Sequence, residues 1–233
     1  MYYRRSIADS FKEDPNFKQK WPGAEFIKVN YSSIPDLVSA LKDIETVICT
    51  FTVFTDDAVE AERNLITAAV ESGCSRFCPS EFAGKLNTIP SYYRKAQIIE
   101  VLERTPELEY TAFSPGFFMD YFAVPRAITH LAQFVAYVDA EAGEAIVGGT
   151  GDEPIVLTSA KDTARFVVGA CALPKGRWPK FGGIVGERTS LNKIISLVES
   201  LKGWSYSLRS ADAARKEIPG ASPHVERDRR RQL

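Results

Sequence analysis

Apolar runs alternate with amphipathic stretches through the first half of the chain. Four short runs rich in apolar and β-branched residues are bounded by turn residues, which is typical of strands. These runs are residues 25–31, 45–51, 76–79 and 110–114. Between them apolar positions recur at helical spacing, in residues 34–41, 58–72 and 91–104. Strands that alternate with helices in this way favour right-handed crossovers, so the sequence predicts an α/β fold with a doubly wound, Rossmann-like parallel sheet.

Local signals mark the ends of these predicted elements. Ser33 and Asp36 form a capping box that starts the first helix, and Gly73 ends the second. The run at 45–51 is almost continuously apolar, which favours a strand covered on both faces.

The second half of the chain contains a glycine-rich stretch at residues 148–151. It lies between two strand-like runs, 145–147 and 155–157. Because no helix opens directly after the glycines, they predict a hairpin turn rather than a phosphate-binding loop.

Two further helices are predicted, one starting at Ser159 and one starting after Ser190 and ending at Gly203. We expect residues 1–117 to form the Rossmann-like portion. Residues 118–233 would form a smaller mixed portion that covers the substrate and packs on the first within a single domain.

The charge balance narrows the choice of partners. The chain has 29 Lys and Arg against 30 Asp and Glu, interspersed, so it lacks the basic field that drives nucleic-acid or anionic-membrane binding. The basic run at 227–231 is interpreted as a solvated terminus, with a basic tail as the alternative. No apolar stretch is long enough to span a bilayer and the first residues do not resemble a signal peptide, so a cytoplasmic location is expected.

The cysteines and histidines give no sign of a metal or a nucleophile. The four cysteines lie in or beside apolar runs, so buried structural thiols are the favoured interpretation. The two histidines lack ligand spacing and no Gly-x-Ser-x-Gly elbow is present, so neither a metal site nor a serine-hydrolase triad is expected.

The candidate functional residues lie near the ends of the predicted strands. Segments 79–82 and 115–118 follow two strands at their carboxyl ends, where parallel α/β sheets bind ligands. The alternatives are an ordinary turn with a helix cap for the first segment and an aromatic plug for the second.

Lys95 is the strongest single candidate in this region. Ile99 and Leu102 follow it at helical spacing, which places it on the buried stripe near a helix start, where its pKa should be lowered. The alternative is a lysine that reaches solvent from a half-buried stem. A Tyr/Lys dyad is absent because position 91 is serine, and Tyr92 is the nearest substitute.

These segments resemble the NmrA-like and isoflavone reductase-like group of atypical short-chain dehydrogenases/reductases, from about Arg4 to about Trp204. The parts that carry the resemblance are 47–52, 73–82, Lys95 in its helix, and 109–118. The resemblance implies a Rossmann-type domain that binds NADPH, with a lone catalytic lysine that Lys95 matches. It also places Met1 inside the second strand, so the first strand, the glycine-rich loop and the first helix are expected to be missing.

The expected site residues fall into three groups. The catalytic residue is Lys95, and the substrate contacts are Gly116, Phe117, Phe118 and Tyr121. The cofactor contacts are Arg4, Arg5, Thr50, Phe51, Thr52, Ser80, Glu81, Phe82 and Lys95. In the resemblance, the two arginines match the position that meets the 2′-phosphate of NADPH.

The leading hypothesis is an NADPH-dependent reductase that transfers hydride to a small aromatic or conjugated substrate. The alternative is a non-catalytic regulatory or nucleotide-sensing protein of the NmrA-like type that has lost the phosphate-binding loop. The oligomeric state stays open, a homodimer included.

Overall fold

The computed structural model describes residues 3–7, 19, 23–50, 53, 55–84, 93–123, 131, 137–139, 142–203 and 207–210. The chain divides into two compact units. Unit 1 is Met1–Gly116 with Thr163–Ile184, and unit 2 is Phe117–Asp162 with Val185–Leu233. Residues 163–184 therefore belong to the same unit as the first half of the chain.

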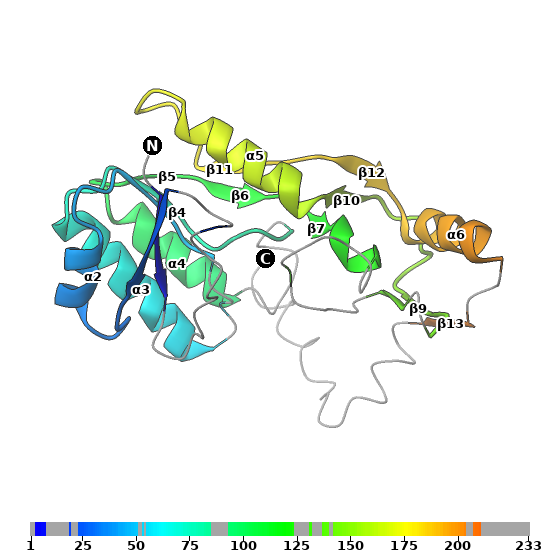
Figure 1. The fold of residues 1–233 in the computed structure, drawn as a ribbon. Coiled ribbons are helices and arrows are strands. Elements are labelled where there is room, and N and C mark those ends of the chain that lie inside the picture. Colours follow the sequence, from blue (N-terminus) through cyan, green and yellow to red (C-terminus); the bar gives the residue numbers. More distant parts are fainter. Residues whose placement is uncertain are drawn as a thin grey trace, which may run out of the picture. The chain divides into compact units, whose positions relative to one another are not determined.

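Unit 1 combines parallel strands with helices (Figure 1). Its strands are β1 (Tyr3–Ile7), β2 (Ala24–Lys28), β3 (Thr46–Ile48), β4 (Arg76–Cys78), β5 (Glu109–Tyr110), β6 (Ala112–Ser114) and β11 (Phe181–Gly183). Its helices are α2 (Ile34–Ala40), α3 (Asp56–Glu71), α4 (Tyr93–Glu103) and, from Thr163 onward, α5 (Ala160–Cys171). The pairs β1–β2, β3–β4, β4–β5 and β6–β11 are all parallel, which confirms the predicted Rossmann-like α/β class.

Strand β4 carries a hydrophobic core on each of its faces. Phe77 is fully buried in a cluster built with α2, α3 and α4. Its neighbour Cys78 is equally buried but belongs to a second cluster with Val167 of α5 and Trp178. Successive side chains of a strand point to opposite faces, so helices cover both faces of β4, as a doubly wound sheet requires (Figure 1).

The predicted helix ends are confirmed at several positions. Ser33 is the N-cap of α2 and its hydroxyl accepts the Asp36 N–H at 3.4 Å. Gly73 follows α3 with φ of +79°, a left-handed conformation that favours glycine.

Two strand predictions differ from the structure. Ile48 at the end of β3 is 42% exposed, so the expectation of a strand covered on both faces is wrong there. The predicted strand 110–114 is interrupted at Thr111, whose hydroxyl donates to the Pro179 carbonyl at 2.7 Å. Because β5 pairs with β4 while β6 pairs with β11, this single apolar run contributes one strand to each of two sheets.

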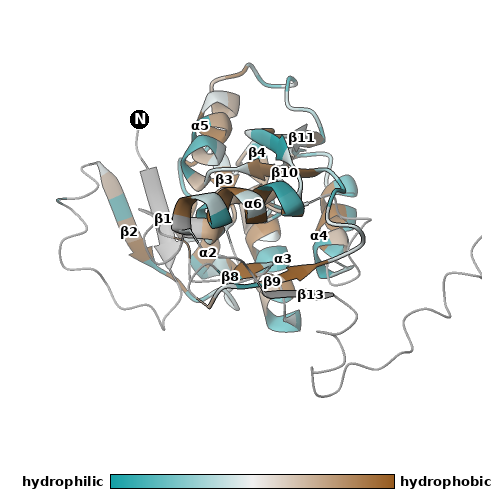
Figure 2. Cartoon of the chain, turned by 90° about the vertical axis from the view of Figure 1, so that its right-hand side faces the viewer, coloured by the Kyte–Doolittle hydropathy of each residue, from teal (hydrophilic) through white to brown (hydrophobic). Residues whose placement is uncertain are grey.

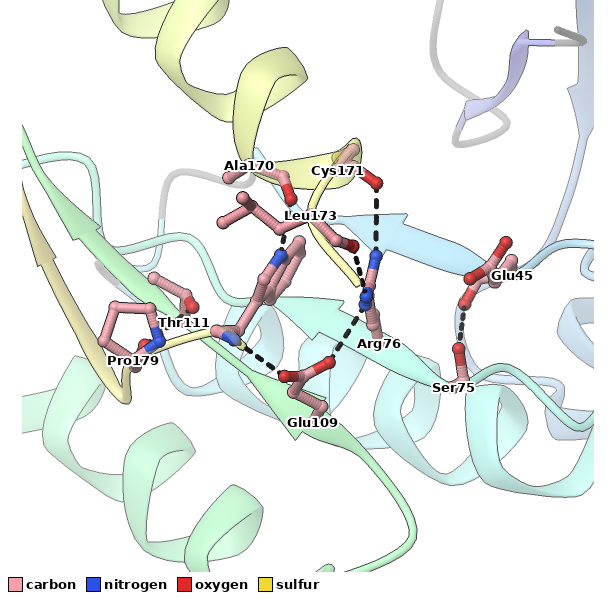
Figure 3. A network of polar contacts seen from close by, with 10 residues as sticks. Glu45, Ser75, Arg76, Glu109, Thr111, Ala170, Cys171, Leu173 and Pro179 are labelled. Atoms are coloured by element: carbon pink, nitrogen blue, oxygen red, sulfur yellow. Dashed lines mark hydrogen bonds and ion pairs between the residues drawn. The ribbon is translucent and has the colours of Figure 1, made fainter. Parts of the chain in front are cut away.

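A buried arginine joins the elements around β4 (Figure 3). Arg76, 2% exposed, donates from Nε to Glu109 at 3.0 Å and from its two terminal nitrogens to the carbonyls of Cys171 and Leu173 at 3.1 and 2.8 Å. Glu109 also accepts the Trp178 N–H at 2.7 Å. These bonds tie β4 and β5 to the end of α5 and the segment after it.

The described residues of unit 2 form two small mixed sheets and one long helix. Its elements are β7 (Phe117–Phe118), the 3₁₀ helix η3 (Met119–Ala123), β8 (Val138–Asp139), β9 (Glu144–Val147), β10 (Ile155–Thr158), β12 (Glu187–Thr189), α6 (Leu191–Lys202) and β13 (Ser207–Ser210). The strand orders are β12-β10-β7 and β13-β9-β8. Helix α6 is capped by Ser190 and Gly203 as predicted, and Figure 2 shows hydrophobic and hydrophilic stretches along it.

The predicted hairpin around residues 148–151 is wrong, because β9 and β10 lie in different sheets. The loop between them is shaped by an internal carboxylate instead. Glu153 accepts the N–H groups of Thr150 and Gly151 at 3.0 and 2.9 Å. Backbone amides that could have held an anion are thus bonded to the chain's own glutamate.

The remaining structural expectations concern thiols, metals and membranes. Cys49, Cys74 and Cys78 are buried free thiols, as predicted, and Cys171 is half-buried. Among the residues that the structure describes, no group of histidine, cysteine and acidic side chains could hold a metal ion. Within the same residues no helix is long and apolar enough to cross a membrane. The basic run at 227–231 lies outside them.

Candidate functional site

The structure brings Lys95 to the segment that follows β4. Lys95 is the third residue of α4, and its side chain points inward with 7% of the residue exposed. Its Nζ donates to the carbonyl oxygens of Ser80 and Glu81, at 2.5 and 3.0 Å. The structure thus brings this lysine together with the 79–82 segment at the carboxyl end of β4. The buried helical neighbours are Ile98 and Leu102, with the predicted Ile99 only partly buried.

Glu62 of α3 is a member of this site that the sequence analysis missed. It is 1% exposed, and one carboxylate oxygen accepts the N–H of Ser80 at 2.9 Å. Its carboxylate is also hydrogen-bonded to the thiol of Cys49, which follows β3. The available signal was its position: Val59 and Ile66 lie three before and four after it, on the buried face of α3.

Burial controls the protonation of the three charged groups. It lowers the pKa of Lys95, and the nearby Glu81, Glu62 and Cys49 partly offset that effect. It raises the pKa of Glu81 to about 7, with Lys95 acting in the opposite direction and Glu62 in the same one. It also raises the pKa of Glu62, against the Ser80 amide, the Cys49 thiol and Lys95.

This arrangement suits proton transfer near neutral pH. An amine whose pKa is lowered gives up its proton more readily than an ordinary lysine, and Glu81 beside it exchanges a proton near pH 7. Perturbed groups of this kind, placed at the carboxyl edge of a parallel α/β sheet, are typical of functional sites.

The structure describes only some of the other predicted cofactor contacts. Thr50 is exposed just beyond β3, and Ser80 is 5% exposed. Phe82 is half-buried and packs against the cluster that contains Cys78 and Trp178. Arg4 and Arg5 lie in β1, but their side chains fall outside the described residues, as do Phe51, Thr52 and Tyr92.

Of the predicted substrate contacts, Gly116 belongs to unit 1 and the three aromatic residues belong to unit 2. Gly116 is the last residue of its segment of unit 1 and has φ of +74°. The ring of Phe117 lies 5.2 Å from Tyr121 and 5.4 Å from Tyr137, and Phe118 lies 6.0 Å from Tyr121, between ring centroids. The three predicted aromatic residues thus form one cluster, and their contact with a substrate stays a prediction.

The fold is that of a Rossmann-like α/β protein with a buried lysine at the carboxyl edge of its sheet. The chain belongs to the NmrA-like family, whose sequence profile matches residues 7–208.

Fungal relatives share a substantial part of the sequence. Oxidoreductase BOA1 of Botryotinia fuckeliana (strain B05.10) is 30% identical over 222 residues, 91% of this chain and 73% of that protein. Oxidoreductase swnR of Arthroderma benhamiae (strain ATCC MYA-4681 / CBS 112371) is 30% identical over 186 residues, 76% of this chain. The chain spans 60% of the length of that second relative.

Solved reductase structures share the fold. A crystal structure of isoflavone reductase is 20% identical, with a TM-score of 0.70 over 95% of this chain and 75% of that one. A complex of AtPrR2 with NADP+ and (+)pinoresinol is 18% identical, with a TM-score of 0.63 over 82% of this chain and 64% of that one.

Proposed function

We propose that the chain carries the cofactor-binding and proton-transferring part of an NADPH-dependent reductase that acts on a small aromatic or conjugated substrate. The observation that carries the proposal is the buried Lys95, held against the Ser80 and Glu81 carbonyls beside two buried carboxyl groups. It is supported by the oxidoreductase names of the fungal relatives and by the NADP+ bound in the AtPrR2 structure.

The donors at this edge of the sheet fit the sugar of a nucleotide. The exposed Thr50 after β3, the Ser80 hydroxyl and the Lys95 ammonium are all groups that hydrogen-bond ribose hydroxyls. Arg4 and Arg5 of β1 are the proposed partners of the 2′-phosphate, because a guanidinium binds phosphate in a bidentate manner.

In this proposal NADPH, when bound, supplies the hydride. Lys95 donates a proton from Nζ to the substrate atom on which negative charge develops, and burial favours this loss of its charge. Phe117, Phe118 and Tyr121 are the proposed substrate contacts, because flat aromatic rings stack on one another.

The test compares the wild type with Lys95→Met in NADPH oxidation against a panel of enones, quinones and aldehydes. We expect turnover with some member of the panel, and a loss of about 100-fold or more in kcat for Lys95→Met. NADPH affinity, followed by the quenching of tryptophan fluorescence, should change much less. Lys161→Met, on an exposed position of α5, is the matched control. Turnover that survives in Lys95→Met would rule out the proposed role.

A nucleotide-sensing protein without turnover is the second candidate. It is favoured by the two hydrogen bonds that Lys95 already makes to backbone carbonyls, which is also how a purely structural lysine would be held. NADPH binding with no oxidation by any panel member would support this second function.

A further inference from the structure

Ser80 is held from both sides by oppositely charged side chains. Its N–H donates to the Glu62 carboxylate at 2.9 Å, and its carbonyl accepts from Lys95 Nζ at 2.5 Å. The residue therefore connects a helix before β4 with a helix after it. Any displacement of Glu62 would move the carbonyl against which Lys95 is placed.

Glu62, Glu81 and Lys95 form a buried cluster in which two acidic groups face one basic group. Glu62, Glu81 and Lys95 are 1%, 4% and 7% exposed. If both carboxyl groups were ionised, the enclosed cluster would carry a net negative charge, which is costly away from water. One carboxyl group must then keep a proton over part of the pH range, and the geometry distinguishes the two.

We propose that Glu62 is a positioning residue of the Lys95 site, which keeps its negative charge near neutral pH and also fixes Ser80, and that Glu81 is the carboxyl group that gains and loses the proton there. This inference rests on the proposed function for its role in catalysis. Its assignment of charge can be measured without turnover.

The hydrogen bonds favour this division. Burial raises the pKa of Glu62 as well, but its carboxylate accepts from the Ser80 amide and from the Cys49 thiol, and such donors stabilise the ionised form and offset part of that rise. For Glu81 the bonds to Lys95 run through the backbone carbonyl, while its side chain is buried near Glu62. Burial and that like charge both raise the pKa of Glu81, to about 7.

The groups that face the cluster come from every element around it. Cys49 follows β3, Glu62 lies on α3, Glu81 follows β4 and Lys95 lies on α4. The Cys78 thiol of β4 is also within electrostatic reach of both carboxyl groups, and burial raises its pKa well above the ordinary value, so it stays neutral.

The test is a ¹³C NMR titration of side-chain carboxyl groups in glutamate-labelled protein. The signal that titrates near neutral pH should disappear in Glu81→Gln and persist in Glu62→Gln. In Glu62→Gln the amide oxygen can still accept the Ser80 N–H, but the negative charge is gone. We therefore expect the Glu81 titration to shift down by about one pH unit. Glu60→Gln changes an exposed residue of the same helix and should leave the Glu81 titration at its wild-type pH.

A second readout is the pKa of Lys95, followed by ¹⁵N NMR of its ammonium and assigned by its loss in Lys95→Met. Glu62 opposes the lowering of this pKa, so Glu62→Gln should lower it further. If Glu62→Gln fails to fold, Glu81→Gln still decides the matter. In that variant the Glu62 carboxyl should titrate below the pH at which Glu81 titrates in the wild type.

Two results would overturn the inference. One is a near-neutral signal that belongs to Glu62, and the other is an unchanged Glu81 titration in Glu62→Gln. Failure of the proposed function is a separate result, namely no NADPH binding or oxidation by the wild type while the titrations behave as described.

Discussion

Glu81 should make the stability of the protein depend on pH around neutrality. Its pKa is raised from the ordinary 4.5 to about 7, so between those values the folded protein keeps a proton that the unfolded chain has lost. The free energy of unfolding should then fall as pH rises through this window and level off above it. Each unit of difference in pKa amounts to about 1.4 kcal/mol, so the whole effect is about 3.5 kcal/mol at most.

Glu81→Gln removes this titration. In urea unfolding from about pH 5 to about pH 8, the variant should gain stability relative to the wild type as pH rises. Glu60→Gln on the exposed side of α3 should show a constant difference. Parallel curves for Glu81→Gln and the wild type would mean that Glu81 titrates normally.

The site residues differ in how well the sequence predicts them. Lys95 could be predicted because the helical periodicity places it on the apolar face of α4. The family resemblance pointed to the same residue. Glu62 lies on the buried face of α3 in the same way, but a charged residue at such a position is usually a surface residue. Its bond to the Ser80 N–H, from a residue 18 positions away, and its bond to the Cys49 thiol help to explain its burial.

At the scale of elements, we expect Arg76 to be a main contributor to the stability of unit 1. Arg76→Met would remove one donor from Glu109 and the Arg76 donors from the carbonyls of Cys171 and Leu173. Breaking a buried ion pair by removing one partner costs about 3 kcal/mol or more. Urea unfolding at neutral pH measures this loss directly.

Arg76→Lys tests whether the shape of the side chain matters as well as its charge. An ammonium lacks the planar fork that reaches three acceptors, so this variant should recover only part of the lost stability. Arg104→Met, at an exposed position after α4, is the control and should change stability by less than about 0.5 kcal/mol. A similarly small effect of Arg76→Met would show that the network contributes little.

Helix ends and strand partners were predicted with different success. The caps at Ser33, Ser190 and Gly203 depend on a few neighbouring residues, so the sequence alone locates them. The predicted pairing of β9 with β10 was wrong, because β9 pairs with the nearby β8 and the distant β13, and β10 pairs with the distant β7 and β12. The change of strand partner at Thr111 likewise depends on a distant strand, β11. Partners of this kind leave no local signal in the sequence.

At the scale of the whole molecule, the division into two units predicts where NADPH binding slows amide hydrogen exchange. Lys95, Ser80 and Thr50 all belong to unit 1, so bound NADPH should slow amide hydrogen exchange in β4 and α4. A ligand that binds only the folded state and is present at about 100 times its Kd stabilises that state by about 2.7 kcal/mol. Where exchange requires unfolding of the bound unit, this corresponds to a roughly 100-fold slowing of exchange. Exchange in α6, which belongs to unit 2, should change much less. Mass spectrometry of peptides from the two units, with and without NADPH, makes the comparison, and equal or greater slowing in α6 would place the binding site outside unit 1.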